Sequence, residues 1–580
     1  MRSGLGEVTA ERMGAFLEGF QRAMPLERAE LTLFAAAVRA ELVAYIAARP
    51  EDVQVVSSAV TSLRTLSTLD LSAVIEGADL TDAILRRDPA GIYPGMDERT
   101  RGMYLAEITR LARKRRTSEQ KIAQTLLSLA EGAGPGEARH VGWWLLEKPP
   151  GGENARGGAA AYAAANAALT VAVSAAAGAL TRSVWSAVLS LLPASELVKG
   201  LMDAAVLRFS RPRLIPRMDL PGGVPEEGLT VCAVSALLTG EGSGREIAGK
   251  IEEYRHASRE CGKNLLFALL ADLPEARERD MPEDAARIAA AKAAFDELNE
   301  KYSGGFYLLC RPRVYSERDG RYMPRERKRG AIMALAALTQ GLESELTVVS
   351  GDAAPLRRVK YILALDSDTR LLPGAASELI GAMLHPLNRP QVEGGMVVRG
   401  RGVIHPRMDT ELESAVKTRF SRIFAPEGGT DPYSSACGEV WMDLAGRGGF
   451  SGKGIIDAAA LIECCSGLPD GVLSHDAIEG ALLRGGYMSD TALMDSFPSA
   501  PLPYFKRLHR WTRGDWQNIR FIAPNSGLPW VERLKLFDSL RRSLVPLGMT
   551  ASVFFAAALP SAGTLAAAGV SAAALLSHVP

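Results

Sequence analysis

Two aspartates separated by a single residue, Asp366 and Asp368, follow a short apolar run in the stretch YILALDSDTRLLPGA, residues 361–375. Such a run, bounded by Pro and Gly, predicts a buried strand of an α/β sheet, and these sheets bind ligands beyond the carboxyl ends of their strands. Residues i and i+2 of a strand point the same way, so both carboxylates can face one divalent cation. The alternative interpretation is an Asx turn or the cap of the following helix.

A second strand-end acid and a basic run precede this pair. Asp272 closes the apolar run LLFALLAD, which predicts that its carboxylate reaches the same edge of the sheet; a turn residue before Pro274 is the alternative. The run ERKRG, residues 326–330, holds three cations shortly before the Asp-Ser-Asp strand. Beside a metal site these cations can attract a pyrophosphate, although a basic run is also typical of a solvated surface.

Two more groups of functional side chains follow the aspartate pair. In LSHDAIEGALLRGGY, Asp476 and Glu479 stand at i and i+3 at the start of a predicted helix, where an N-cap with a first-turn acid is the alternative interpretation. In RLHRWTRGDWQN, residues 507–518, basic and aromatic residues interleave directly before an apolar segment. An anchor at a membrane interface would have the same composition.

The elements that must position these residues are predicted over about 211–541. Apolar runs and helical patterns alternate there, for instance LTVCAVSALLTG, KNLLFALLAD, GFYLLCRP and KYILALDSD, which predicts a parallel α/β sheet. Residues 1–150 have a charged, helical pattern and no candidate chemistry by themselves, and EKPPGGENARGG reads as a linker.

Two regions have the composition of membrane-spanning segments. Residues 157–181 carry no charge, and residues 183–209 begin apolar, which together predict a hairpin over 151–210 with its tip near Arg182. An Ala-rich soluble helix is the alternative for the first segment. From residue 543 onward there is no Lys, Arg, Asp or Glu, which predicts a second hairpin over 542–580. The basic clusters RPRLIPR and RLKLFDSLRR would then be cytoplasmic, and so would the catalytic residues.

Composition excludes some classes of protein. The chain has 580 residues with 67 Lys plus Arg and 67 Asp plus Glu, so no overall charge favours nucleic acid as a partner. The six cysteines, the fourth of them Cys437, have no Cys-x-x-Cys spacing and fit a reduced compartment better than a disulfide framework or a zinc site. The amino terminus lacks the pattern of a signal peptide.

Several motifs together resemble those of the cyclic β-1,2-glucan synthases. They are RDPAGIYPGMDERTR, HVGWWLL, HPLNRP, DPYSSA, FSGKGIID, SHDAIEG and HRWTRGDWQ, spread over residues 88–516. The resemblance implies a GT-A-type glycosyltransferase domain flanked by transmembrane helices, with an amino-terminal helical cytosolic region. It also implies a multi-pass protein of a bacterial inner membrane that moves glucose from UDP-glucose to a growing β-1,2-glucan with inversion.

The resemblance also implies roles for the candidate residues. Asp366 and Asp368 would hold Mg²⁺ or Mn²⁺, because a leaving diphosphate needs cations that absorb its developing charge. Asp476 would be the base for the acceptor hydroxyl, and Glu479 would support it. The donor would contact Asp366 and a further set of residues, Asp272, Arg507, Arg510, Trp511 and Arg513.

A tyrosine of the chain would serve as the primer if the resemblance holds fully. Tyr254, in IEEYRHASRE, is the first choice, and packing of its helix on the sheet is the alternative role. Compared with the family pattern, this chain has Leu508 before His-Arg-Trp and carries Arg401 and His405 in GRGVIHPR. Trp441 and Met442 also depart from it. Family members are several times longer and carry a carboxy-terminal phosphorylase-like region.

Two alternative functions stay open from the sequence. One is another processive polysaccharide synthase of the same superfamily, with a different sugar or linkage. The other is a catalytically silent membrane protein that binds UDP-sugar or glucan. Two other enzyme classes are excluded by their motifs. DSDTR lacks the spacing of the haloacid-dehalogenase phosphotransferases, and GGFSGKG lacks the Ser or Thr that follows the lysine of a P-loop.

Overall fold

The computed structural model describes residues 8–69, 71–149, 158–426, 438–472 and 475–576. The motif DPYSSA and Cys437, both singled out from the sequence, lie outside the described residues, as does the first residue of SHDAIEG. The chain divides into two units, Met1–Asn154 and Ala155–Pro580.

The first unit is helical, as its charged, periodic sequence predicts. Helices α1, α3, α5, α6 and α7 each begin after a Thr, Asp or Ser whose side chain accepts a hydrogen bond from a backbone N–H of the first turn. The helices are α1 (Ala10–Ala23), α2 (Arg28–Ala48), α3 (Val53–Thr68), α4 (Ser72–Ala78), α5 (Leu80–Leu85), α6 (Glu98–Arg115) and α7 (Glu119–Glu131).

A buried polar cluster joins two of the quoted motifs inside this unit. The Asp88 carboxylate accepts hydrogen bonds from the backbone N–H groups of Tyr93 and Val141 and contacts His140 Nδ1 at 2.8 Å. The hydroxyl of Tyr104 lies 3.0 Å from His140 Nε2. A Cβ on Gly142 would lie 2.1 Å from that hydroxyl, so only glycine fits beside the cluster. These residues of RDPAGIYPGMDERTR and HVGWWLL therefore have a structural role in this unit.

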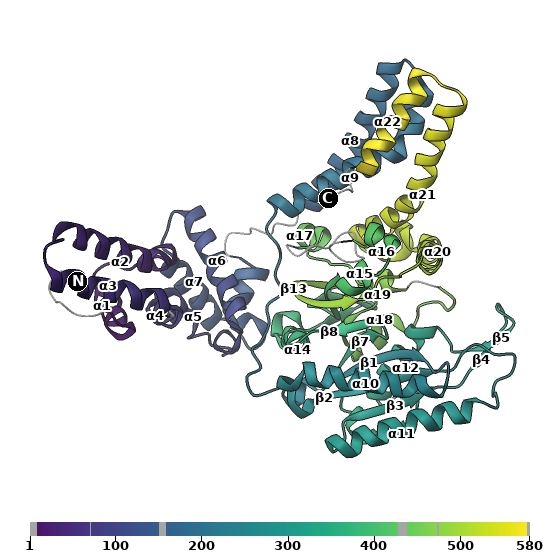
Figure 1. The fold of residues 1–580 in the computed structure, drawn as a ribbon, viewed down its shortest axis with the longest axis horizontal. Helices are drawn as coiled ribbons and strands as arrows, with labels where there is room; N and C mark the ends of the chain where they lie inside the picture. Colours follow the sequence, from purple (N-terminus) through teal and green to yellow (C-terminus); the bar gives the residue numbers. More distant parts are fainter. Residues whose placement is uncertain (1–7, 70, 150–157, 427–437, 473–474, 577–580) are drawn as a thin grey trace. The chain divides into compact units, whose positions relative to one another are not determined.

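The second unit contains a nine-stranded mixed sheet in the order β6-β3-β2-β1-β7-β12-β11-β13-β8 (Figure 1). Strands β3, β2, β1 and β7 are parallel, while β6, β12 and β8 pair antiparallel with their neighbours. The strands are β1 (Thr230–Leu237), β2 (Leu265–Asp272), β3 (Phe306–Cys310), β6 (Thr347–Ser350), β7 (Tyr361–Asp366), β8 (Thr369–Leu371), β11 (Val403–Thr410), β12 (Gly454–Asp457) and β13 (Gly486–Asp495).

The predicted α/β class is confirmed, and the predicted parallel pairing holds for β3, β2, β1 and β7, whereas the sheet as a whole is mixed. Regular alternation of strand and helix, which favours parallel pairing, covers only β1, β2, β3 and β7. The short TVVS strand β6 was not recognised, and β8 and β12 are strands of three and four residues that follow turns or loops. Such short strands carry too little periodicity to be predicted.

Helices cover both faces of the sheet, because side chains of its central strands alternate between two buried layers. Cys232 and Val234 of β1 pack with α10 (Glu241–Ala257), α11 (Asp284–Tyr302) and α14 (Ala375–Leu384). Val231 and Ala233 of the same strand pack with α12 (Arg327–Thr339) and α18 (Ala458–Cys465). The central strands are therefore buried on both faces, which explains their continuous apolar sequences.

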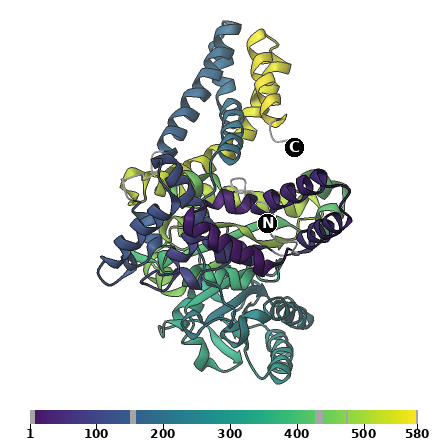
Figure 2. The ribbon, with the colours of Figure 1, turned by 90° about the vertical axis from the view of Figure 1, so that its left-hand side faces the viewer.

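The helical segments of residues 158–209 and 530–576 project beyond the sheet in both ribbon views (Figures 1 and 2). The chain turns between the first two helices at Arg182, where φ is +53°, as the predicted hairpin requires. The third helix begins well before the predicted boundary at residue 542. These helices are α8 (Gly158–Thr181), α9 (Val184–Phe209), α21 (Trp530–Ala558) and α22 (Ala562–Leu576).

Three helices of the described chain are long and apolar enough to cross a membrane, judged by length and composition: α2, α8 and α9. Helices α8 and α9 are the two expected from the sequence. Helix α2 belongs to the first unit, where the charged, helical pattern of residues 1–150 does not predict a membrane-spanning segment. Helix α22 is apolar but has only 15 residues.

Candidate active site

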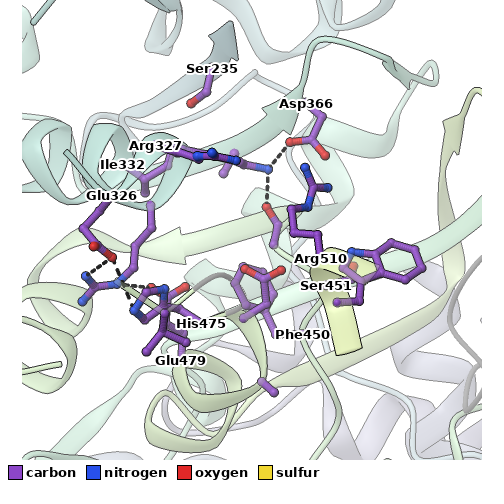
Figure 3. Close-up of a pocket in the computed structure, with 18 of the residues that line it drawn as sticks. Ser235, Glu326, Arg327, Ile332, Asp366, Phe450, Ser451, His475, Glu479 and Arg510 are labelled. Carbon is purple, nitrogen blue, oxygen red and sulfur yellow. Dashed lines mark hydrogen bonds and ion pairs between the residues drawn. The ribbon is translucent and has the colours of Figure 1, made fainter. Parts of the chain in front are cut away.

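The carboxyl ends of three strands place the predicted acids at one edge of the sheet. In the register of the sheet, Ser235 of β1 pairs with Asp366 of β7, and Leu237 pairs with Asp272 of β2. Asp366 and Asp272 therefore flank the end of β1, as the apolar runs before them predicted. A cavity of about 1640 Å³ opens at this edge, and Asp366, Asp368 and Asp476 line it (Figure 3).

Asp366 lies between two lysines. Lys328 Nζ is 2.5 Å from Oδ1, and Lys453 Nζ is 3.1 Å from Oδ2. Burial raises the pKa of Asp366, but the two ammonium groups outweigh this effect and bring the pKa down to about 2. Lys328 also donates to the carbonyl of Gly452 at 2.6 Å. The carboxylate is therefore ionised and held from both sides.

Lys453 reaches this position because β12 runs antiparallel to β7. Gly454 pairs with Ala364, so the residue that precedes β12 lies beside the carboxyl end of β7. Lys453 also forms an ion pair with Asp495, whose Oδ1 accepts from the Thr369 hydroxyl at 2.8 Å. In the sequence Lys453 stands in GGFSGKG, which lacks the features of a P-loop and indicates no other role for the lysine.

Asp368 is the more open of the two predicted metal ligands. Its side chain is 41% exposed, and Arg507 Nη2 lies 3.5 Å from Oδ2. Among the described residues, no group of three or more His, Cys, Asp or Glu side chains is placed to hold a metal ion. Mg²⁺ is commonly held by one or two carboxylates together with substrate phosphates and water. The residues present therefore fit a cation completed by a diphosphate, and not one held by protein side chains alone.

Asp476 stands at the first position of helix α19 (Asp476–Leu482) and is half-buried. No described residue donates a hydrogen bond to its carboxylate. Burial raises its pKa; Lys328 acts against this shift, and the charge of Asp366 adds to it. A Cβ on Gly452 would lie 2.9 Å from Asp476 Oδ2, and φ of Gly452 is +79°, so this loop can approach the carboxylate only with glycine there.

Glu479 lies one turn further along α19 and is only 7% exposed. Burial and the neighbouring Asp476 raise its pKa to about 7, against the opposing effect of Arg329. Arg329 Nε donates to Glu479 Oε1 at 3.1 Å, and Arg329 also contacts Glu326 (Figure 3). Two carboxyl groups on one helix thus have raised pKa values, which is typical of acid–base sites.

Asp272 is bound by Arg311, a residue that no sequence motif indicates. Arg311 Nε and Nη2 donate to its two carboxylate oxygens at 2.6 and 2.8 Å. Asp272 also lines a second cavity of about 1080 Å³ together with Lys328, Asp368 and Arg510. Its position at the edge is as predicted, while its contact with the donor's uracil or ribose stays a prediction.

Helix α20 (Pro501–Gln517) brings the basic and aromatic residues of RLHRWTRGDWQN to the larger cavity, where Arg507, Arg510, Trp511 and Arg513 all line the wall. The guanidinium of Arg507 lies 5.9 Å from the centre of the Trp511 ring. In Figure 3 the side chain of Arg510 extends toward Asp366. This cationic wall can receive an anionic group.

Tyr254 is buried in the structure. It is 2% exposed, and its hydroxyl donates to the backbone carbonyl of Thr369. Burial moves its pKa well above the ordinary value for tyrosine. This arrangement matches packing of α10 on the sheet, the alternative weighed for Tyr254, and priming at Tyr254 stays a prediction.

The departures from the family pattern lie largely outside the cavity. Arg401 is buried and donates to the carbonyls of Gly446 and Gly485, and His405 is buried beside the ring of Tyr487. Trp441 is buried as well. These substitutions therefore act on packing within the second unit.

Sequence comparison finds one curated relative. The chain is 30% identical over 540 residues, 86% of its length, to the cyclic β-(1,2)-glucan synthase NdvB of Rhizobium meliloti (strain 1021). The match covers 19% of that relative, so the chain corresponds to about a fifth of its length. No family model matches the chain. The resemblance expected from the motifs is thereby confirmed for a part of such a protein.

Structural comparison finds the mannosyltransferase PcManGT from Pyrobaculum calidifontis, solved in complex with GDP-Man and Mn²⁺. The alignment covers 68% of this chain and 98% of that one, with 12% identity and a TM-score of 0.39. A likeness of this size supports no conclusion about ligands.

Proposed function

Because the chain matches one part of a cyclic β-(1,2)-glucan synthase over most of its length, we propose that it is a membrane glucosyltransferase. It transfers glucose from UDP-glucose to a growing β-1,2-glucan with inversion at the sugar carbon. The observation that carries the proposal is the single cavity in which Asp366, Asp476 and Glu479 lie beside Lys328 and Arg510. The domain that holds this cavity is assigned to the GT-A type on the same grounds.

The donor side of the cavity suits a nucleotide diphosphate. Lys328, Arg507 and Arg510 offer cationic donors to phosphate oxygens. A divalent cation, Mg²⁺ or Mn²⁺, would be held by Asp366 and Asp368 and would supply positive charge to the leaving diphosphate. Lys328 donates to Asp366, so its ammonium group lies next to the carboxylate that would hold the cation and the diphosphate.

The acceptor side of the cavity suits general base catalysis. The Asp476 carboxylate is open to a hydroxyl group and takes its proton while the hydroxyl oxygen attacks the glucose carbon. The bond from that carbon to the phosphate oxygen breaks at the same time, and UDP leaves. Glu479, with its pKa near 7 and its contact to Arg329, orients the acceptor or stabilises the charge of Asp476.

The membrane assignment rests on the apolar helices. Helices α8 and α9 are long enough for a bilayer core of about 30 Å. The basic clusters before and after the sheet domain favour the cytoplasmic side of a bacterial inner membrane for the cavity, where UDP-glucose is available.

The proposal is tested by assaying membranes that carry the full chain with radiolabelled UDP-glucose. We expect UDP release together with incorporation of label into a β-1,2-linked glucan, identified by linkage analysis. A different linkage would assign the chain to another polysaccharide synthase. No UDP release, with UDP-glucose still bound, would show a silent sugar-binding protein and refute the proposal.

Initiation on the protein is tested in the same membranes. If Tyr254 is the primer, labelled glucose becomes covalently attached to the chain, and Tyr254→Phe abolishes this label while UDP-glucose binding is unchanged. Tyr254 would first have to give up its hydrogen bond to Thr369. UDP release without any label on the denatured protein would exclude self-priming.

A further inference from the structure

A small hairpin outside the main sheet carries two facing tyrosines. Strands β4 (Val314–Ser316) and β5 (Arg321–Met323) pair antiparallel as a separate two-stranded sheet (Figure 1). Tyr315 and Tyr322 stand directly opposite each other, with ring centres 5.2 Å apart in an edge-to-face arrangement. Tyr315 is 52% exposed. Two-stranded hairpins are only marginally stable by themselves, so this one depends on contacts with the rest of the chain.

The hairpin is fixed at its base by buried contacts. Arg313, directly before β4, donates to both carboxylate oxygens of Asp284 at 2.5 and 2.9 Å, and to the carbonyl of Pro274 at 2.6 Å. Ala276 and Tyr322 exchange two backbone hydrogen bonds of 2.9 and 3.0 Å. The exposed tyrosine ring therefore projects from a fixed element.

The hairpin is also held near its tip. Arg318 Nη1 donates to the carbonyl of Gly471 at 2.9 Å, in the loop that leads to Asp476. Residues of the hairpin, Tyr315 and Arg318 among them, line the same cavity as Asp476. A ligand that extends along this cavity from Asp476 meets the hairpin.

The chemistry of the hairpin suits a neutral sugar. An aromatic ring is a good surface for the apolar C–H face of a pyranose, and a phenol hydroxyl can bond to sugar hydroxyls. Glu317, Arg318 and Asp319 lie in the turn of the hairpin and Arg321 begins β5, so the four charges of these residues balance. Such a balance offers hydrogen-bonding groups without favouring an anion such as a nucleotide.

We propose that the β4–β5 hairpin is a distal binding site for the acceptor glucan, with Tyr315 stacking on a glucose unit remote from the growing end. This inference rests on the proposed function, because it takes the acceptor to be a chain of glucose units. It predicts that Tyr315 matters for acceptors long enough to reach the hairpin and not for the donor or for short acceptors.

The test compares Tyr315→Ala with the unaltered full chain in detergent micelles, using the β-1,2-linked disaccharide and a longer β-1,2-gluco-oligosaccharide as acceptors. We expect the KM for the longer acceptor to rise about three- to tenfold, as loss of one aromatic contact implies. The KM for the disaccharide, the KM for UDP-glucose and the kcat stay unchanged. Tyr315→Phe keeps the ring and restores the low KM. The same exchange in the first unit, Tyr45→Ala, is the matched control.

The inference would be overturned if Tyr315→Ala and the unaltered chain had equal KM values for the longer acceptor. It would also be overturned if Tyr315→Ala raised the KM for the disaccharide as much as the KM for the longer acceptor. If the unaltered chain releases no UDP, the proposed function fails, and the hairpin is tested separately by saturation-transfer NMR with the longer oligosaccharide. Binding that Tyr315→Ala abolishes then supports the site, and binding that it leaves unchanged refutes it.

Discussion

At the scale of single residues, Asp476 and Glu479 are two carboxyl groups on one short helix with different surroundings. Asp476 receives no hydrogen bond from any described residue, whereas Glu479 accepts one from Arg329. A base must be free to take a proton, and a supporting group must be held in place. The structure therefore favours Asp476 over Glu479 as the base.

Replacement of Asp476 by asparagine tests this assignment. We expect Asp476→Asn to bind UDP-glucose normally and to transfer sugar about 10²- to 10⁴-fold more slowly, because a positioned base acts on the acceptor only. Donor affinity is measured by equilibrium binding and transfer by UDP release. A parallel loss of donor binding would instead mean that Asp476 contacts the donor or supports the fold.

Asp368 gives the cleaner test of the metal. Asp366→Asn would also remove the anion that holds Lys328 and Lys453, whereas Asp368 has the exposed side chain of the pair. We expect Asp368→Asn to abolish transfer and to make UDP binding insensitive to Mg²⁺ and Mn²⁺. Wild-type turnover in both variants would exclude a metal at this pair.

At the scale of elements, the loop before β12 lines the cavity next to Asp476. Gly452 approaches the carboxylate and offers its carbonyl to Lys328. Its positive φ disfavours any other residue, and its contact with Asp476 excludes a side chain.

Comparing alanine substitutions at Gly452 and at a control glycine separates the effect of backbone strain on stability from the effect of displacing Asp476 on sugar transfer. Gly452→Ala and Gly395→Ala both place a Cβ at positive φ, +79° and +74°, at a cost of about 1–2 kcal/mol each. The space at Gly395 is open, whereas at Gly452 the Cβ meets Asp476. We expect similar losses of thermal stability, but a loss of sugar transfer only for Gly452→Ala. Full transfer by Gly452→Ala would show that Asp476 tolerates displacement.

The helix hairpin α8–α9 predicts a topology. A reporter fused at Arg182, between the two helices, should be accessible from outside the cell, and one fused near Gly320 should not. Labelling from opposite sides is measured in intact cells with a reagent that does not cross the membrane. The reverse pattern would contradict both the hairpin and access of the cavity to cytoplasmic UDP-glucose.

At the scale of the whole molecule, protonation of Glu479 links stability to pH. Its pKa is raised from 4.5 to about 7 in the folded chain, so between these values the folded state binds the extra proton. Stability should therefore fall as pH rises from about 4.5 to 7 and change little from this source above 7. Glu479→Gln should flatten this part of the profile, as followed by thermal unfolding in micelles. An unchanged slope in the variant would assign the effect to other groups.

The sequence was sufficient for the residues that stand at the ends of long apolar strands. Asp272 and Asp366 could be placed at one edge of the sheet because long apolar runs predict the strands that precede them. Asp476 could be placed at the start of a helix because a helical pattern follows it. Of the two lysines that contact Asp366, Lys328 lies in the basic run that the sequence places near the predicted metal site, whereas Lys453 could not be foreseen. Lys453 arrives through the antiparallel insertion of the four-residue β12, and neither the direction nor the neighbour of so short a strand is encoded locally.

Arg311 was missed for a related reason. It follows β3, and its contact with Asp272 depends on β2 and β3 being neighbours in register, which is a property of the whole sheet. The buried contacts of Arg401 were likewise beyond sequence patterns, because they depend on which faces of the elements meet. The packing of Tyr254, in contrast, is one of the two roles that the sequence offers for it.

Helix α21 connects the cavity with the apolar end of the second unit. Lys535 and Arg542 line the cavity near its beginning, and the helix continues to Ala558, about 35 Å beyond Lys535. Pro546 stands between these two parts, where the loss of a backbone hydrogen bond allows bending. Helix α21 can therefore bend at Pro546, between its cavity-lining part and its apolar part. On the proposed membrane assignment, a change in bilayer thickness that tilts the apolar part of α21 would move Lys535 and Arg542 at the cavity, except for the part of the tilt that bending at Pro546 absorbs.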